Sequence, residues 1–377
     1  MRKTITQVLT PLLLAAGLVG CGSNSNTATA PVTVTQPVTV FGTATPSSAA
    51  GAVWRQALVS TYSPPSSQFT ARTDHSSVSF SGALWVIGGD DGAYLNDAWK
   101  SADGTHWTQV LTDTASPATS QFTERRGQAV AVMGGWMWLV GGYDGSHYLN
   151  DVWKSSDGAS WTRVLADNAS PGSSQFPERA WHSLVAANGY LWLFAGYDGS
   201  TYWNDAWKSS DGVTWTRVLT ASVSPTGAQF TGRDAQSAVA FKGALWMAGG
   251  FNGYSQMNDV WNSTDGASWT QVLPDRSSPP SSQFPQRSNQ MMAVYDPSTG
   301  LDQGGELWIL GGFNPNTSPV YLSDVWSSPD GANWSEHSVS AAFPGRMGAT
   351  AGVLDGSLWV MGGNDGGFYF NDVWSTP

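Results

Sequence analysis

The feature of this sequence that most limits its fold is a motif that recurs along most of the chain. The motif is a Phe followed three residues later by an Arg, and four of its six copies follow one another at intervals of 54 residues. Similarity at a fixed spacing indicates an architecture built from repeated units. The arginines of the six copies are Arg72, Arg125, Arg179, Arg233, Arg287 and Arg346. The chain therefore contains six related units.

Each unit predicts four short antiparallel strands. In the second unit we expect strands over residues 127–133 and 136–140, a third that contains 150–153, and a fourth over 161–165. The last two are joined through Asp157-Gly158, a strong hairpin signal because the favoured two-residue turn needs positive φ at both central residues. Many aromatics and glycines with few charged residues also favour short strands and tight turns. Six such units predict an all-β fold, a six-bladed β-propeller.

The two ends of the chain predict how the ring closes. The sixth unit stops after Trp374, where the other five units continue through Asp-Gly into a fourth strand. The missing strand is present at the start of the repeat region, over residues 54–59, which match 107–111. We expect this N-terminal strand to complete the last blade, which would leave no exposed edge to promote aggregation.

The motifs resemble the kelch repeat over residues 54–377. The resemblance rests on a strand that ends in Gly-Gly, an Asn-Asp-x-Trp strand, a Trp-Thr strand and the preceding Arg. Ala195-Gly196 is the one departure from the Gly-Gly pair. The resemblance implies a propeller of four-stranded blades. Galactose-oxidase-like copper chemistry, known in kelch propellers, needs a Cys crosslinked to Tyr, and residues 54–377 contain no cysteine. We therefore expect no cofactor and no metal.

The N-terminus predicts export and lipidation. Arg2 and Lys3 precede an apolar stretch too short to span a membrane as a mature helix. The segment 18–21, Leu-Val-Gly-Cys, resembles the lipobox of bacterial lipoproteins. That resemblance implies a signal peptide over residues 1–20 and lipid on Cys21; the alternative is an ordinary signal peptide that contains a cysteine. Because Cys21 is the only cysteine, neither a disulfide nor a Cys-based nucleophile is possible in the folded part.

Residues 21–53 are expected to form a disordered tether. No charged residue occurs from 22 to 53, and the segment is rich in Ser, Thr, Ala and Pro, so it cannot bury enough apolar surface to fold. Loss of residues 1–20 would change the formal charge from −11 to −13, which makes nucleic acid a poor partner. We expect an extracytoplasmic protein, held by its lipid at an outer membrane or cell surface.

The six arginines of the motif allow two interpretations. A ring of guanidinium groups could bind an anion. Alternatively, each Arg pairs with the Asp that precedes the Trp of the third strand, at a nearly constant offset. We favour this structural pairing, because a feature present in every blade serves every blade. The six Asp residues are Asp97, Asp151, Asp205, Asp259, Asp324 and Asp372.

A ligand site is expected where the repeat breaks its own pattern, which happens just after the arginines. Arg126, Trp181, Asp234 and Asn289 would place a charge, an aromatic platform and polar groups around one channel mouth, a mixture that suits a sugar. The alternative for Trp181 is packing between blades. His75 and His182 stand at a neighbouring position and complete the candidate ligand-binding set. Two histidines without a third ligand are expected to form hydrogen bonds in the first strand rather than hold a metal.

Three classes of function remain open. The first is a non-catalytic binding module that recognises a glycan or a protein through the face with the long loops. The second is an enzyme on acidic sugars, similar to kelch-type sialic acid mutarotases, with Glu124 or Glu178 as acid/base and Arg126 or Arg179 as anion clamp. The third is a structural surface protein, which predicts no pocket. We favour the first, because no acid stands out from the repeat as a catalytic group.

Overall fold

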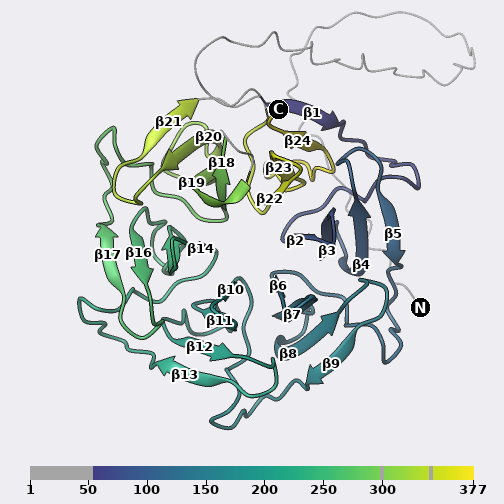
Figure 1. The fold of residues 1–377 in the computed structure, drawn as a ribbon, viewed down its shortest axis with the longest axis horizontal. Coiled ribbons are helices and arrows are strands. Elements are labelled where there is room, and N and C mark those ends of the chain that lie inside the picture. Colours follow the sequence, from purple (N-terminus) through teal and green to yellow (C-terminus); the bar gives the residue numbers. More distant parts are fainter. Residues whose placement is uncertain (1–53, 298–300, 339–342) are drawn as a thin grey trace, which may run out of the picture. The chain divides into compact units, whose positions relative to one another are not determined.

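The fold is a six-bladed β-propeller, as the repeat predicts. The computed structural model describes residues 54–297, 301–338 and 343–377, so the predicted signal peptide, Cys21 and the tether lie outside the described residues. Six four-stranded antiparallel sheets surround a central axis (Figure 1). Over the described residues there is no helix, and hence none long and apolar enough to cross a membrane.

The blades follow chain order. Blade 1 comprises β2 (Ser76–Phe80), β3 (Ala83–Asp90), β4 (Tyr94–Ser101) and β5 (Thr108–Leu111), and blade 2 comprises β6 (Ala129–Met133), β7 (Trp136–Tyr143), β8 (Tyr148–Ser155) and β9 (Thr162–Leu165). Blade 3 comprises β10 (Ser183–Ala187), β11 (Tyr190–Phe194), β12 (Ala206–Ser209) and β13 (Thr216–Leu219), and blade 4 comprises β14 (Ser237–Phe241), β15 (Ala244–Ala248), β16 (Val260–Ser263) and β17 (Thr270–Leu273). Blade 5 comprises β18 (Met291–Asp296), β19 (Leu301–Phe313), β20 (Tyr321–Ser328) and β21 (Ser335–Ser338), and blade 6 comprises β22 (Thr350–Leu354), β23 (Ser357–Met361), β24 (Val373–Ser375) and β1 (Arg55–Leu58).

The N-terminal strand completes the last blade, which confirms the predicted closure. β1 pairs antiparallel with β24, with Arg55 opposite Ser375 and Gln56 opposite Trp374. Trp54 contacts Phe343 edge to face, with ring centroids 5.2 Å apart. In blade 1 the same contact joins Phe69 to Trp107 at 4.9 Å. The last blade is therefore assembled from both ends of the chain.

The core lies between neighbouring blades. One apolar cluster joins Trp85 and Ile87 of blade 1 to Met137, Leu139 and Trp161 of blade 2, and five related clusters occupy the other junctions. Because each blade buries its apolar surface against the next, the six units form one compact ring.

The first strand of blade 2 is shorter than predicted. It begins at Ala129 instead of residue 127, because Gly127 has a φ of +63° and this left-handed conformation interrupts a strand. The second strand is longer and continues to Tyr143. We call the face that carries the segments before each first strand, and the loops between each second and third strand, the long-loop face.

Candidate functional site

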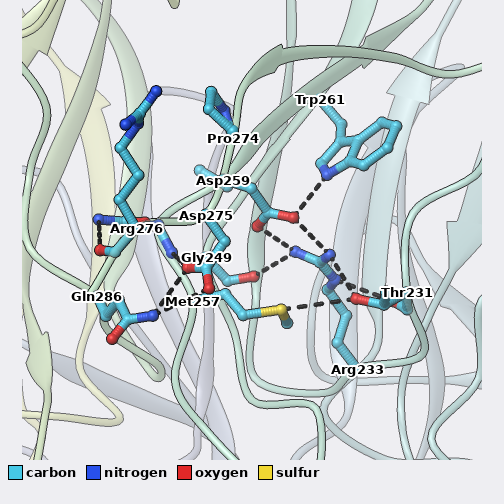
Figure 2. Close-up of polar contacts among 12 residues, drawn as sticks. Thr231, Arg233, Gly249, Met257, Asp259, Trp261, Pro274, Asp275, Arg276 and Gln286 are labelled. Atoms are coloured by element: carbon cyan, nitrogen blue, oxygen red, sulfur yellow. Dashed lines mark hydrogen bonds and ion pairs between the residues drawn. The ribbon is translucent and has the colours of Figure 1, made fainter. Parts of the chain in front are cut away.

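The six motif arginines are buried inside the blades. Arg233 is fully buried, and its Nη1 and Nη2 donate to the two carboxylate oxygens of Asp259 at 2.7 and 2.8 Å (Figure 2). Its Nη1 also donates to the Gly249 carbonyl at 2.9 Å, and Trp261 Nε1 donates to the same carboxylate at 2.7 Å. The guanidinium thus has its hydrogen bonds inside the blade.

The other five blades repeat this bidentate ion pair. Every one of these arginines has an exposed fraction of 0%. They therefore offer no anion site, and the pairing that we favoured from the sequence is present in each blade. The pairs are Arg72–Asp97, Arg125–Asp151, Arg179–Asp205, Arg287–Asp324 and Arg346–Asp372.

A closed ring of backbone hydrogen bonds surrounds the axis at the long-loop face. Its members stand two residues after each motif Arg, and each N–H donates to the carbonyl of its neighbour at 2.8–3.2 Å. All six have φ between +51° and +63°, a conformation that glycine adopts without strain and most other residues avoid. The members are Asp74, Gly127, Trp181, Ala235, Asn289 and Gly348. We call this ring, with the adjoining Arg126 and Asp234, the channel mouth.

Trp181 lies across the channel mouth. A β-carbon at Gly127 would stand 3.0 Å from Cε2 and Nε1 of the Trp181 indole, so the ring system rests directly on this glycine. The indole also forms a hydrogen bond with the side chain of Asp74, on blade 1. Trp181 therefore reaches from blade 3 over blade 2 to blade 1, and it is partly exposed at the mouth rather than buried between blades.

Arg126 is held beside this indole. Its Nη1 donates to Asp90 at 2.8 Å, and its guanidinium carbon lies 5.1 Å from the ring centroid of Tyr94 and 5.5 Å from that of Trp181. The side chain is 29% exposed, and its Nε has no hydrogen-bond partner in the described part of the chain. The charge of Arg126 is therefore already engaged with Asp90.

Two further carboxylates stand at the mouth on opposite blades. Asp74 belongs to blade 1 and Asp234 to blade 4, which face each other across the axis in Figure 1. Burial, and then the charge of Asp74, raise the pKa of Asp234 to about 7. Burial also raises the pKa of Asp74, although the charge of Arg126 and the hydrogen bond from Trp181 oppose that shift. Asn289, on blade 5, is partly exposed at the same ring.

A cavity of about 230 Å³ lies at this mouth. Its lining includes Asp74, Trp181 and Asn289 together with a layer of five almost completely buried side chains, each 4–7% exposed. Every residue of that layer has at least one polar atom without a partner among the described residues. The unpartnered atoms are Nδ1 of His75, both ring nitrogens of His182, and the Oε1 oxygens of Gln128, Gln236 and Gln290. Because a neutral imidazole keeps one N–H, the unpaired acceptors of the cavity include the three glutamine oxygens and one ring nitrogen of His182.

The two histidines differ from the prediction. Each immediately precedes its first strand instead of lying in it. His75 forms the expected hydrogen bond, between its Nε2 and Thr350 Oγ1 at 2.8 Å. His182 has none in the described ranges, so that part of the expectation is wrong. Thr350, the partner of His75, stands four residues after the motif Arg of the preceding blade, and the matching residue for His182 is Ala129, which has no hydroxyl. Burial, and then the charges of Arg72 and Arg179, lower the pKa of both histidines to about 3.

Ala195 replaces the first glycine of the Gly-Gly pair, and this departure changes the hydrogen bond of one glutamine in the buried layer, Gln236. Gln128 and Gln290 donate from Nε2 to the carbonyls of Ile87 and Ala248 at 2.9 and 2.7 Å, next to the first glycine of the preceding blade's pair. A β-carbon on those glycines would stand 2.8 and 2.7 Å from the amide nitrogen. Ala195 has that β-carbon, and Gln236 instead donates to Ser183 Oγ at 3.0 Å.

Sequence reasoning did not single out an arc of aromatic rings around the mouth. Consecutive ring centroids lie 4.5–6.0 Å apart from blade 1 to blade 4. A signal for it exists, because a Tyr stands two residues before the Asn of the third strand in several units. Sequence reasoning also passed over Asp74 as a site residue. The rings are Tyr94, Tyr143, Tyr148, Tyr197, Tyr202 and Phe251.

Within the described ranges, no group of three or more His, Cys, Asp or Glu side chains could hold a metal ion. The fold and the repeated Arg–Asp–Trp unit define a six-bladed β-propeller built from one sequence repeat. A family model described as the kelch motif matches residues 124–154, within blade 2. The chain is a kelch-repeat β-propeller.

Similar proteins carry the name leucine-zipper-like transcriptional regulator 1. The homologue from Drosophila melanogaster is 25% identical over 289 residues, which is 74% of this chain and 28% of that protein. The human and mouse proteins are each 29% identical over 166 residues, or 42% of this chain and 19% of theirs. The chain thus matches less than a third of the length of these relatives.

Proposed function

We propose that this protein is a non-catalytic binding module that presents the channel mouth of its propeller to a glycan or protein ligand outside the cytoplasm. The observation that carries the proposal is the loss of six-fold symmetry at the mouth. The scaffold pairs recur in all six blades. In contrast, Trp181, which lines the cavity, and Arg126 and Asp234, which directly precede the lining residues Gly127 and Ala235, each occur in one blade only. A site that differs between otherwise equal blades indicates a specific ligand.

An anchor at Cys21 completes the proposal. The lipobox-like segment and the uncharged stretch that follows it support a lipid-anchored propeller on a tether at an outer membrane or cell surface. Labelling with radioactive palmitate in a bacterial host tests this part. The wild-type chain should incorporate label and sediment with membranes, whereas a Cys21→Ser chain should do neither. Label in the Cys21→Ser chain would contradict the anchor.

The geometry favours the binding module over an enzyme that acts on acidic sugars. Arg179, one of the two anion clamps in that alternative, is fully buried and paired with Asp205. The other, Arg126, is paired with Asp90, and the carboxylates of Asp74 and Asp234 stand at the same mouth. An anionic sugar would therefore meet more negative than positive charge. A purely structural role is disfavoured by the lined cavity, since such a role predicts no pocket.

A thermal-shift screen of the mature chain, with Cys21 replaced by Ser, tests the proposal. The panel contains neutral, acidic and amino sugars, basic and acidic peptides, and Ca²⁺. A ligand present at 100 times its Kd stabilises a protein by about 2.7 kcal/mol, which is a clear shift in Tm. A shift with at least one sugar or peptide supports the module. The absence of any shift across the panel would favour the structural alternative.

A further inference from the structure

The mouth holds two carboxylates without a cationic partner. Among the described residues, neither Asp74 nor Asp234 takes part in an ion pair, and the nearby Arg126 is bound to Asp90 instead. The two groups belong to opposite blades: Asp74 lines the cavity, and Asp234 directly precedes Ala235, which lines it from the other side of the axis. The charge of Asp74 also raises the pKa of Asp234, so the two carboxylates repel each other. A cation placed between them would relieve this repulsion.

A second observation, independent of the two carboxylates, also points to a ligand. His182 is 6% exposed, lines the same cavity, and has no partner for either ring nitrogen within the ranges that the structure describes. Gln128, Gln236 and Gln290 each leave an unpartnered side-chain oxygen there as well. Buried acceptors that remain unpaired are costly, so hydrogen-bond donors are expected to satisfy them in the occupied state.

We propose that the channel mouth binds an amino sugar, with its ammonium group between Asp74 and Asp234 and one face of its ring on the indole of Trp181. This inference rests on the proposed binding function and specifies its ligand class. The ammonium group supplies the missing cation. The hydroxyl groups supply donors for the glutamine oxygens and His182, and the apolar face of a pyranose stacks on an exposed indole.

The side chain of a lysine fits these observations less well. It carries an ammonium group, but its aliphatic stem offers no donors to the buried acceptors that line the cavity. A basic peptide would therefore satisfy the carboxylates and leave the buried layer unpaired. The amino sugar satisfies both sets of groups with one molecule.

Calorimetric titration of the full mature chain, with Cys21 replaced by Ser, tests the inference at pH 7, where the amine of an amino sugar still holds its proton for the most part. The ligands are glucosamine, N-acetylglucosamine, glucose and Nα-acetyl-lysine methylamide. The first three differ only at carbon 2, so they isolate the amine. We expect glucosamine to bind at least tenfold more tightly than each of the other three. The Asp234→Asn chain should lose at least tenfold of that affinity.

Asp355→Asn is the matched control, because it removes one negative charge from the exposed turn between β22 and β23 on the opposite face. It should bind glucosamine as the wild type does. If the Asp234→Asn chain does not give a cooperative thermal transition, Asp74→Asn takes its place with the same expectation. Equal affinity for glucose and glucosamine would overturn the inference and leave the binding module standing.

Three other results would also overturn it. One is tighter binding of the lysine derivative than of glucosamine. Another is glucosamine affinity that is unchanged in both mouth variants. The last is a wild-type chain that binds none of the four ligands. If no member of the thermal-shift panel raised the Tm either, the proposed binding function would be contradicted together with this inference.

Discussion

The indole of Trp181 rests on Gly127 of the neighbouring blade, so closely that a β-carbon at Gly127 would stand 3.0 Å from indole Cε2. Both residues belong to the backbone ring at the axis, and both have positive φ. A β-carbon at this position would push the indole away by a few tenths of an ångström, so the glycine lets the indole lie close over the mouth toward Asp74. The most distinctive side chain of the site therefore depends on the smallest residue of the next blade.

Replacement of Gly127 by Ala should displace this indole. The left-handed φ of +63° alone costs an alanine about 1–2 kcal/mol, and contact with the indole adds to that cost. Gly134→Ala is the control, because Gly134 has a φ of +61° and nothing within 4 Å of its would-be β-carbon. In urea denaturation we expect Gly127→Ala to lose more stability than Gly134→Ala. Equal losses would mean that the indole does not rest on Gly127.

Removal of one motif arginine should destabilise the propeller strongly. In Arg233→Met, the buried carboxylate of Asp259 loses its cation, which typically costs about 3–5 kcal/mol. The double variant Arg233→Met/Asp259→Leu should recover part of this loss, because no uncompensated charge remains buried. The free energy of unfolding from urea titrations measures both. A single variant as stable as the wild type would contradict the structural role of the pair.

The Ala195 departure should be a weak point of the scaffold. Ala195 has a φ of +62°, and its methyl group occupies the place where Gln128 and Gln290 set their amides in other blades. We expect Ala195→Gly to stabilise the protein by about 1 kcal/mol in urea denaturation. The converse change, Gly141→Ala at the matching position, should destabilise it. Ala195→Gly without any gain would show that the strain is absent.

Stability should fall as the pH rises through 7. The pKa of Asp234 is about 7 in the folded chain and about 3.9 in an unfolded one, so the folded state binds more protons between these values and is favoured at the lower pH. The groups that act on this carboxyl or sense its charge are Asp74, Tyr148 and Tyr202. From pH 6.5 to 8 we expect a loss of roughly 1 kcal/mol in the free energy of unfolding.

Between pH 6.5 and 8 the two buried histidines contribute little to the change in the free energy of unfolding. Their folded pKa values of about 3 lie below the usual value, so His75 and His182 weaken the fold only as the pH falls below about 6.5. Urea titrations at several pH values measure the effect. The dependence between pH 6.5 and 8 should be smaller in Asp234→Asn. An equal slope in that variant would contradict the assignment to Asp234.

The sequence predicts the scaffold far better than the site. The hydrogen bonds of Arg233 to Asp259 follow from residues at nearly constant offsets in every unit, and Trp54 matches Trp107 so closely that ring closure could be read directly. The course of the Trp181 side chain over Gly127 could not be read from the sequence, because it depends on the rotamer of that side chain between two blades. The positive φ values of the backbone ring could be predicted in part, because four of its six members are residue types that tolerate this conformation. These four are Asp74, Gly127, Asn289 and Gly348.

Thermal-shift titration of two tryptophan variants tests the central claim, that the channel mouth is the ligand site. The ligand is the one from the panel that most stabilises the wild type. Trp181→Ala removes the indole at the mouth, and Trp136→Ala removes an indole that is 36% exposed at the start of β7 on the opposite face. We predict that the ligand no longer raises the Tm of Trp181→Ala and still raises that of Trp136→Ala. A full shift in Trp181→Ala, or its loss only in Trp136→Ala, would contradict the account.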